Sequence, residues 1–314
     1  MDFVMMRKEP IANKRRYNAS KRAEAINGYL FVAPIVIGTV IFSIVPILYS
    51  FYLSLMNWDG LGEKIFIGFD NFVDIFKDAT LLQPLSNTLY YTLGTVPLGM
   101  ILAVFLANIL NKKIVGKGIF RVIYYLPNVT MAAAVAIVWR WIFNSEYGLI
   151  NLFLGSIGLP QPSWLGDPNF IMPAIIMVSI WGSIGYNMVF ILSGMQNIPE
   201  QLIEAAKLDG ANGRNIFWKI TLPILTPTLF FLLTMSVMGA LKVFDIVFMF
   251  AAGGQMLGGA VVDASKSLVY GIFENAFTLM KMGVASAQAV VLFGLILVVT
   301  IIQFALQKKW VYYD

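Results

Sequence analysis

Residues 283–306 read GVASAQAVVLFGLILVVTIIQFAL, and this stretch contains no charged side chain. An α-helix rises about 1.5 Å per residue, so a run of this length covers the roughly 30 Å hydrocarbon core of a bilayer. The run is continuously apolar and lacks the strict alternation that is typical of membrane β-strands. The stretch therefore predicts a transmembrane helix.

Five other apolar runs have a comparable length, and they cover residues 28–56, 86–110, 122–143, 170–195 and 222–250. Only two of the six runs contain charges, which are Arg140 in the third run and Lys242 and Asp245 in the fifth. The first run is too long for the 7–15-residue core of a signal peptide, and no convincing small-residue cleavage site follows it. We predict an all-α membrane protein with six transmembrane helices.

The composition excludes several function classes. Apolar residues make up 59% of the 314 residues and charged residues 12%, which does not suit the surface of a soluble enzyme. The chain has no Cys and no His, so it lacks thiolate nucleophiles, thiolate metal sites and the commonest metal ligand. With no paired carboxylates in the spans either, an intramembrane enzyme is disfavoured.

The distribution of basic residues predicts the orientation. Of the 22 Lys and Arg residues, sixteen fall in the first 27 residues, in the loops after the second and fourth spans, and at the C-terminus. Four fall in the opposite loops. The positive-inside rule then places both termini in the cytoplasm, and it explains the net charge of +5 without nucleic acid. We predict a basic tail over 1–27, a transmembrane domain over 28–306 and a C-terminal tail over 307–314.

The cytoplasmic loop between the fourth and fifth spans differs from an ordinary turn. It reads NIPEQLIEAAKLDGANGRNIFWKITLPIL from Asn197 to Leu225. Asn197 is a candidate N-cap, helix-forming residues run from Glu200 to Leu208, and Gly210 suits a helix end with positive φ. From these residues alone, the loop is either a solvated amphipathic connector or a docking helix for a partner protein.

Glu204, Ala205 and Ala206, followed by Asp209 and Gly210, resemble the EAA loop of bacterial ABC-transporter permeases. Further matches narrow the resemblance to the maltose-type carbohydrate permeases, and they include Asn57-Trp58, Gly68-Phe69-Asp70-Asn71, Pro127, Trp139–Phe143, Tyr147–Asn151, Phe244-Asp245 and Tyr270. The family usually has a proline after a double glycine, whereas this chain has Gln255.

The resemblance implies the type I ABC importer permease fold in the bacterial inner membrane. It also implies three kinds of partner: a second permease subunit, two cytoplasmic ATPase subunits and an extracellular solute-binding protein. The EAA loop, at about residues 197–222, would couple to the ATPases through Glu204, Ala205, Ala206, Asp209 and Gly210. ATP and Mg²⁺ would bind to those partners, because this chain has no G-x-x-x-x-G-K-[ST] motif and holds no cofactor of its own. The chain is then a transporter subunit and not an enzyme.

Polar groups in two spans are candidates for the substrate path. Trp181 offers a ring for stacking on a sugar, and Tyr186 and Asn187 offer hydrogen bonds, although such residues also make ordinary packing or lipid contacts. Lys242 and Asp245 are spaced i, i+3 and either pair with each other or border the path. Arg140 lies near the outer end of its span, and its side chain is expected to extend to the membrane–water interface.

The transported solute is expected to be a sugar or an oligosaccharide. A glycerol-phosphate or another polyol is the alternative, but a phosphate favours clustered Arg or Lys, and only Lys242 is available in the path. An ion-coupled secondary transporter is a further alternative. It would need acidic sites near the bilayer midplane, where only Asp245 is present.

Overall fold

The computed structural model describes residues 11–112, 114–252 and 259–312. Gln255 lies outside these residues, so the departure from the family pattern has no structural description. The chain forms two compact units, Met1–Tyr52 and Leu53–Asp314. Each unit is described by itself.

The first unit is a long helix that is basic at its start and apolar from Ala25 onward. It consists of α1 (Ile11–Thr39), the π-helical turn η1 (Val40–Ile44) and α2 (Val45–Leu53), whose last residue belongs to the second unit. From Ala25 to Tyr52 no side chain is buried. Residues Glu24–Leu53 are long and apolar enough to cross a bilayer, which agrees with the first predicted span.

The second unit is helical apart from one short hairpin, in which β1 (Met56–Asn57) pairs antiparallel with β2 (Ile65–Phe66). Before the loop at residues 197–222, which we call the coupling loop, the helices of this unit are α3 (Asp70–Lys77), α4 (Ala79–Leu110), α5 (Lys117–Val129), α6 (Ala132–Ile142), α7 (Leu149–Ser156) and α8 (Pro168–Gln196). The loop and the fifth span hold α9 (Glu200–Leu208), α10 (Gly213–Ile216), η2 (Phe217–Thr221), α11 (Leu222–Ile224), α12 (Thr226–Leu241) and α13 (Asp245–Ala252). The chain continues with α14 (Gly259–Ser265), α15 (Leu268–Phe273), η3 (Glu274–Thr278) and α16 (Met282–Trp310).

Five predicted spans are confirmed as long apolar segments, and the third is corrected. The described residues contain five helical segments that can cross a membrane, or up to six if the bent pair α5 and α6 counts as one span. These two helices meet at 101° around Thr130 and Met131, so residues 122–143 do not form a straight helix. Pro127 lies in the last turn of α5 and removes a backbone donor there, which favours a helix end at this point.

The core of the second unit forms around α8. In one cluster, Ile171 and Ile175 of α8 pack with Val247 and Phe250 of α13. A second cluster joins Met188 and Ile191 of α8 to α4 and α12. In that cluster α4 contributes the small residues Ala103 and Ala107, which let helices approach closely where no hydrophobic force drives them together in lipid.

Gly185 permits the close approach of α5 to α8. A Cβ atom at this position would overlap the backbone of Tyr124 and Tyr125 in α5. We expect Gly185→Ala to lower the free energy of unfolding by about 1–3 kcal/mol, because a backbone cannot yield as a flexible side chain does. Thermal unfolding in detergent measures the effect. Gly182→Ala is the matched control on the same helix, since a Cβ atom there would meet no other atom within 4 Å; equal melting temperatures for the two variants would contradict the prediction.

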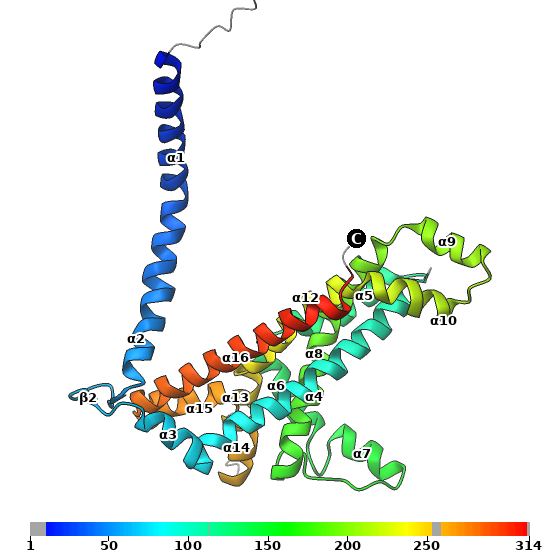
Figure 1. Ribbon diagram of the computed structural model, residues 1–314. Helices are drawn as coiled ribbons and strands as arrows, with labels where there is room; N and C mark the ends of the chain where they lie inside the picture. The colour runs from blue at the N-terminus through cyan, green and yellow to red at the C-terminus, as the bar shows by residue number, and fades with distance from the viewer. Residues whose placement is uncertain (1–10, 113, 253–258, 313–314) are drawn as a thin grey trace, which may run out of the picture. The chain divides into compact units, whose positions relative to one another are not determined.

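Figure 1 shows how the second unit separates two kinds of loop. The helices α9 and α10 project from the end of the bundle at which α16 and the chain finish, while α7 and α14 lie at the opposite end. This arrangement agrees with the predicted topology, in which the loop at 197–222 and the C-terminus share one side of the membrane.

Candidate functional site

The predicted helix of the coupling loop is confirmed with its bounds, because α9 runs from Glu200 to Leu208. Its end has the expected chemistry. Gly210 has φ +83°, and the N–H groups of Gly210 and Ala211 donate to the carbonyls of Lys207 and Ala206 at 3.1 and 2.9 Å. A left-handed glycine of this kind satisfies carbonyls that a helix end leaves open.

The predicted N-cap is wrong. Asn197 ends α8, where its N–H donates to the carbonyl of Gly194, and Pro199 occupies the N-cap of α9 without a side-chain hydrogen bond. The long fourth span simply continues up to this residue. The turn after α9 does contain a cap, since the Asn212 side chain accepts from the backbone N–H of Asn215 at 2.9 Å.

The helix α9 contacts the rest of the unit through Ile203, which packs against the second core cluster, and exposes most of its other residues. None of its residues is buried, and of the five predicted coupling residues only Ala206 is half-buried, while Glu204, Ala205, Asp209 and Gly210 are exposed. The structure adds a residue that the sequence pattern does not single out. Leu208, the last residue of α9, is 90% exposed. The feature of the sequence that could have identified Leu208 is its position directly before Asp209 and Gly210.

A cavity of about 220 Å³ lies within the membrane bundle, among α4, α8 and α12. Its walls are mostly small or hydroxyl-bearing, and they are formed by Tyr91, Thr95, Val96, Gly99, Ser179, Ser183, Asn187, Ser236, Gly239 and Ala240. Asn187 is 4% exposed and lines this cavity. A buried amide needs a partner, so this cavity suits water or a hydroxylated solute.

Asn187 is thus the one predicted path residue that lines this cavity. The other two candidates on α8 contact protein instead. The ring of Trp181 lies edge-on to Trp139, with centroids 5.4 Å apart, and Tyr186 packs on Phe190 at 4.8 Å. The hydroxyl groups of Tyr91 and Ser236 are not predicted, because they come from helices whose relative position the sequence does not reveal.

The expected i, i+3 arrangement of Lys242 and Asp245 does not form. The helix α12 ends at Leu241 and α13 begins at Asp245, so the two charges flank a break and do not share a helix face. Both side chains are exposed, and no ion pair joins them within the described residues. Neither of them lines the 220 Å³ cavity.

Arg140 also departs from expectation. Its Nη2 donates to the backbone carbonyls of Met249 and Phe250, at the end of α13, so the side chain is anchored to protein. The guanidinium carbon lies 5.9 Å from the ring centroid of Phe250. The sequence gives no indication of this contact, because the partners are more than 100 residues away.

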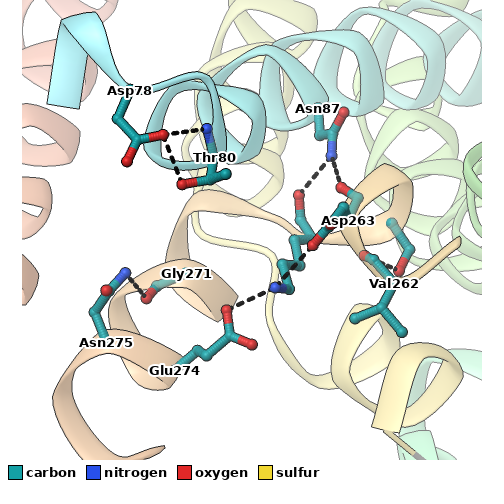
Figure 2. Close-up of polar contacts among 10 residues, drawn as sticks. Asp78, Thr80, Asn87, Val262, Asp263, Gly271, Glu274 and Asn275 are labelled. Atoms are coloured by element: carbon teal, nitrogen blue, oxygen red, sulfur yellow. Dashed lines mark hydrogen bonds and ion pairs between the residues drawn. The ribbon is translucent and has the colours of Figure 1, made fainter. Parts of the chain in front are cut away.

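A polar network fixes the segment around α14 and α15 to α4 (Figure 2). The Asn87 amide donates to the carbonyls of Asp263 and Lys266 at 2.8 and 3.0 Å. The Lys266 ammonium pairs with Asp263 at 3.0 Å and with Glu274 at 2.8 Å. Thr88 adds a hydrogen bond from the N–H of Leu268 to its hydroxyl, at 2.7 Å. Together these contacts hold α14, α15 and the start of η3, which we call the outer segment, in one arrangement against α4.

The network changes the titration of its lysine. Burial alone would lower the pKa of Lys266, but hydrogen bonds and charge attraction from Glu274 and Asp263 outweigh burial and raise the pKa above its ordinary value. The Lys266 side chain is 16% exposed, and it therefore stays charged in this partly buried position. In the described residues no group of three Asp or Glu side chains is arranged to hold a metal ion.

Comparison with known proteins agrees with this architecture. Residues 95–312 match the family described as the binding-protein-dependent transport system inner membrane component. The chain belongs to this family. The permease is also 36% identical over 306 residues to the "Probable ABC transporter permease protein YesP" of Bacillus subtilis, which covers 96% of the permease and 97% of the relative.

Two further proteins resemble the permease along most of its length. The "sn-glycerol-3-phosphate transport system permease protein UgpA" of Agrobacterium fabrum is 34% identical over 286 residues, covering 91% and 96% of the two chains. A solved bacterial ABC transporter "involved in the import of the acidic polysaccharide alginate" has a chain with a TM-score of 0.79 and 22% identity, covering 94% and 99%. The expected ABC-importer permease fold and the inner-membrane location are confirmed, and the ion-coupled alternative is not supported.

Proposed function

We propose that this permease imports a carbohydrate, that it forms the translocation path together with a second permease subunit, and that two cytoplasmic ATPase subunits drive it. An extracellular binding protein would deliver the solute. The observation that carries the proposal is the projecting helix α9, which has no buried residue and exposes Leu208 almost completely. A partner surface that covered Leu208 would remove apolar area from water and so favour docking.

The geometry of α9 suits a coupling role. Hydrogen bonds at both of its ends and the left-handed Gly210 make it a short rigid element on a turned loop. Ala205 and Ala206 add little bulk, so a partner surface can approach the backbone. Glu204, Lys207 and Asp209 surround this site with charge, which would set the orientation of docking. Movement of a docked ATPase would then be transmitted through α10 and η2 to α12.

The hydroxyl-lined cavity supports a carbohydrate as the solute. The hydroxyl group of Ser183 donates to the backbone carbonyl of Ile180 at 3.2 Å, so its lone pairs are available to a solute's hydroxyl donors. Asn187 offers both a donor and an acceptor. No Lys, Arg, Asp or Glu lines the cavity, so it holds no charge of its own.

Asn187→Ala is expected to raise the transport KM for the native solute about threefold to thirtyfold, because one or two hydrogen bonds to the solute are lost. Uptake kinetics in membrane vesicles measure this effect. Trp181→Phe is the control on the same helix, since Trp181 does not line the cavity. An unchanged KM in Asn187→Ala would remove this residue from the path.

The source of energy can be tested directly. Deleting the ATPase subunit while the ion gradient is kept intact is expected to abolish carbohydrate uptake. Uptake that persists without the ATPase, and that collapses when the gradient is dissipated, would overturn the proposal.

A phosphorylated polyol is the second candidate solute. It is favoured by the 34% identity to a permease named for sn-glycerol-3-phosphate transport. Competition for uptake between glycerol 3-phosphate and neutral sugars separates the two candidates.

A further inference from the structure

A second cavity, of about 360 Å³, lies beside the C-terminal end of α6. Arg140, Trp141, Asn144, Tyr147 and Ser163 contribute to its walls, and Phe250 of α13 closes one side. The predicted topology places this end of α6 on the outer side of the membrane. The cavity therefore lies where a solute arrives before it reaches the hydroxyl-lined cavity between α4, α8 and α12.

The rim of this outer cavity is fixed before any solute binds. The Asn144 side chain accepts from the N–H groups of Glu146 and Tyr147 at 2.9 and 3.1 Å. Asn151, which is 1% exposed, donates to the carbonyls of Ser145 and Pro162 at 3.1 and 3.0 Å. A rim held by its own hydrogen bonds loses little conformational entropy when a ligand binds.

The charge of the outer cavity is positive and uncompensated. Arg140 is anchored through Nη2 to the carbonyls of Met249 and Phe250, which orients the guanidinium without neutralising it. No Asp or Glu side chain lines the cavity. Within the described residues no carboxylate forms an ion pair with Arg140. The remaining guanidinium N–H groups are suited to a planar carboxylate or a phosphate.

We propose that the outer cavity binds an anionic group carried on a sugar or polyol, with Arg140 as its recognition residue. The proposal rests on the carbohydrate-transport function given above and narrows its substrate class. Trp141 and Tyr147, each 54% exposed, offer rings for stacking on the carbohydrate. The Asn144 and Ser163 side chains add partners for hydroxyl groups. The anionic group is either a uronate carboxylate or a phosphate ester.

This assignment revises the expectation that Lys242 is the only cation available to a phosphate. The sequence pattern predicts Arg140 as an interfacial residue, whereas the structure places it in a cavity wall. The charged group of the solute would then bind in the outer cavity, and its hydroxyl groups would bind in the hydroxyl-lined cavity between α4, α8 and α12.

Binding can be measured on the purified, assembled transporter without its binding protein. The probes are digalacturonate, glucose 6-phosphate and the neutral sugar maltose, titrated while tryptophan fluorescence is recorded. We expect at least one of the anionic probes to bind about tenfold more tightly than maltose, or more. The tighter of the two then identifies the carboxylate or the phosphate as the preferred group. Equal affinities for maltose and the anionic probes would overturn the proposal.

Variants assign the effect to the charge of Arg140. Arg140→Gln should weaken binding of the anionic probe about tenfold or more, since a charge-assisted hydrogen bond is lost, and should leave maltose binding unchanged. Arg140→Lys should keep the preference for the anionic probe. Lys77→Gln, which removes an exposed outer cation away from the cavity, should have no effect. The proposal is overturned if Arg140→Gln binds as the unaltered protein does, or if Arg140→Lys loses the preference as Arg140→Gln does.

Failure of this proposal is distinguishable from failure of the proposed function. ATPase-dependent carbohydrate uptake with no preference for charge would overturn the outer anion site alone. Absence of any ATPase-dependent carbohydrate uptake would overturn the proposed function, while Arg140-dependent binding of the anionic probe would still report on the cavity.

Discussion

Leu208→Ser is expected to reduce solute uptake in membrane vesicles by about tenfold to a hundredfold while leaving the permease inserted and folded. Leu208 is 90% exposed at the end of α9, so its replacement removes no packing within the chain. Covering a leucine side chain with a partner surface contributes about 1.5–3 kcal/mol, which corresponds to this range of weakened docking. Copurification of the ATPase subunit measures the docking step separately from transport.

Leu152→Ser is the matched control. Leu152 is also exposed, at 57%, but it belongs to α7 at the opposite end of the second unit. A second variant, Gly210→Val, tests the shape of the same loop, because φ +83° is strained for a β-branched residue. Normal uptake and normal ATPase copurification in both Leu208→Ser and Gly210→Val would remove α9 from the coupling role.

Lys266→Met is expected to lower the free energy of unfolding by about 1–3 kcal/mol and to increase mobility of the outer segment. The substitution leaves Asp263 and Glu274 without their shared cation, although Asp263 is 59% exposed and is partly solvated by water. Thermal unfolding near neutral pH gives the loss of stability. Hydrogen exchange of residues in α14 and α15 reports the local effect.

The same lysine predicts a dependence on pH. Because its pKa is raised in the folded protein, its stabilising contribution is complete below the ordinary lysine pKa of about 10.4 and is lost as the pH rises through the folded value. Melting temperatures between pH 8 and pH 11 should therefore fall less steeply in Lys266→Met than in the unaltered protein. Lys281→Met, which removes an exposed outer lysine, serves as the control. Identical slopes for the unaltered protein and Lys266→Met would contradict the prediction.

The predictions that succeeded rest on local chemistry. Apolar length alone predicted the long helices α4, α8 and α16, because a bilayer requires about 20 consecutive apolar residues whatever the neighbouring helices are. The helix Glu200–Leu208 and its end at Gly210 followed from helix formers and a glycine that tolerates positive φ. These features need no knowledge of packing.

Two of the predictions that failed concern breaks in apolar stretches. The bend between α5 and α6 and the gap from Lys242 to Phe244 interrupt runs that apolar length predicts as single helices. Hydropathy measures how well side chains suit lipid and does not register where a backbone turns inside protein. Pro127 is a local signal for the first break, and the charges of Lys242 and Asp245 mark the second, although their spacing also fits one continuous helix.

The candidate sites were only partly predictable for a different reason. Asn187 was identified as a polar residue in a span, but its neighbours Tyr91 and Ser236 come from helices about 50 to 100 residues away. Arg140 and the carbonyl of Phe250 are likewise brought together only by packing of α6 on α13. A single sequence gives the chemical character of such residues and not their distances.

The gap between α12 and α13 has a consequence for the membrane's ion gradients. The carbonyls in the last turn of α12 have no following helical turn, and only those of Gly239 and Ala240 accept from the N–H groups of Lys242 and Val243. An unsatisfied carbonyl in hydrocarbon costs several kcal/mol, so these carbonyls need a polar partner such as water, next to the cavity wall formed by Gly239 and Ala240. A hydrated pocket inside a membrane would conduct protons if it were open at both ends. Along α8, the clusters around Ile171 and Ile191 flank the cavity-lining residues Ser179, Ser183 and Asn187, and their close packing would limit such conduction.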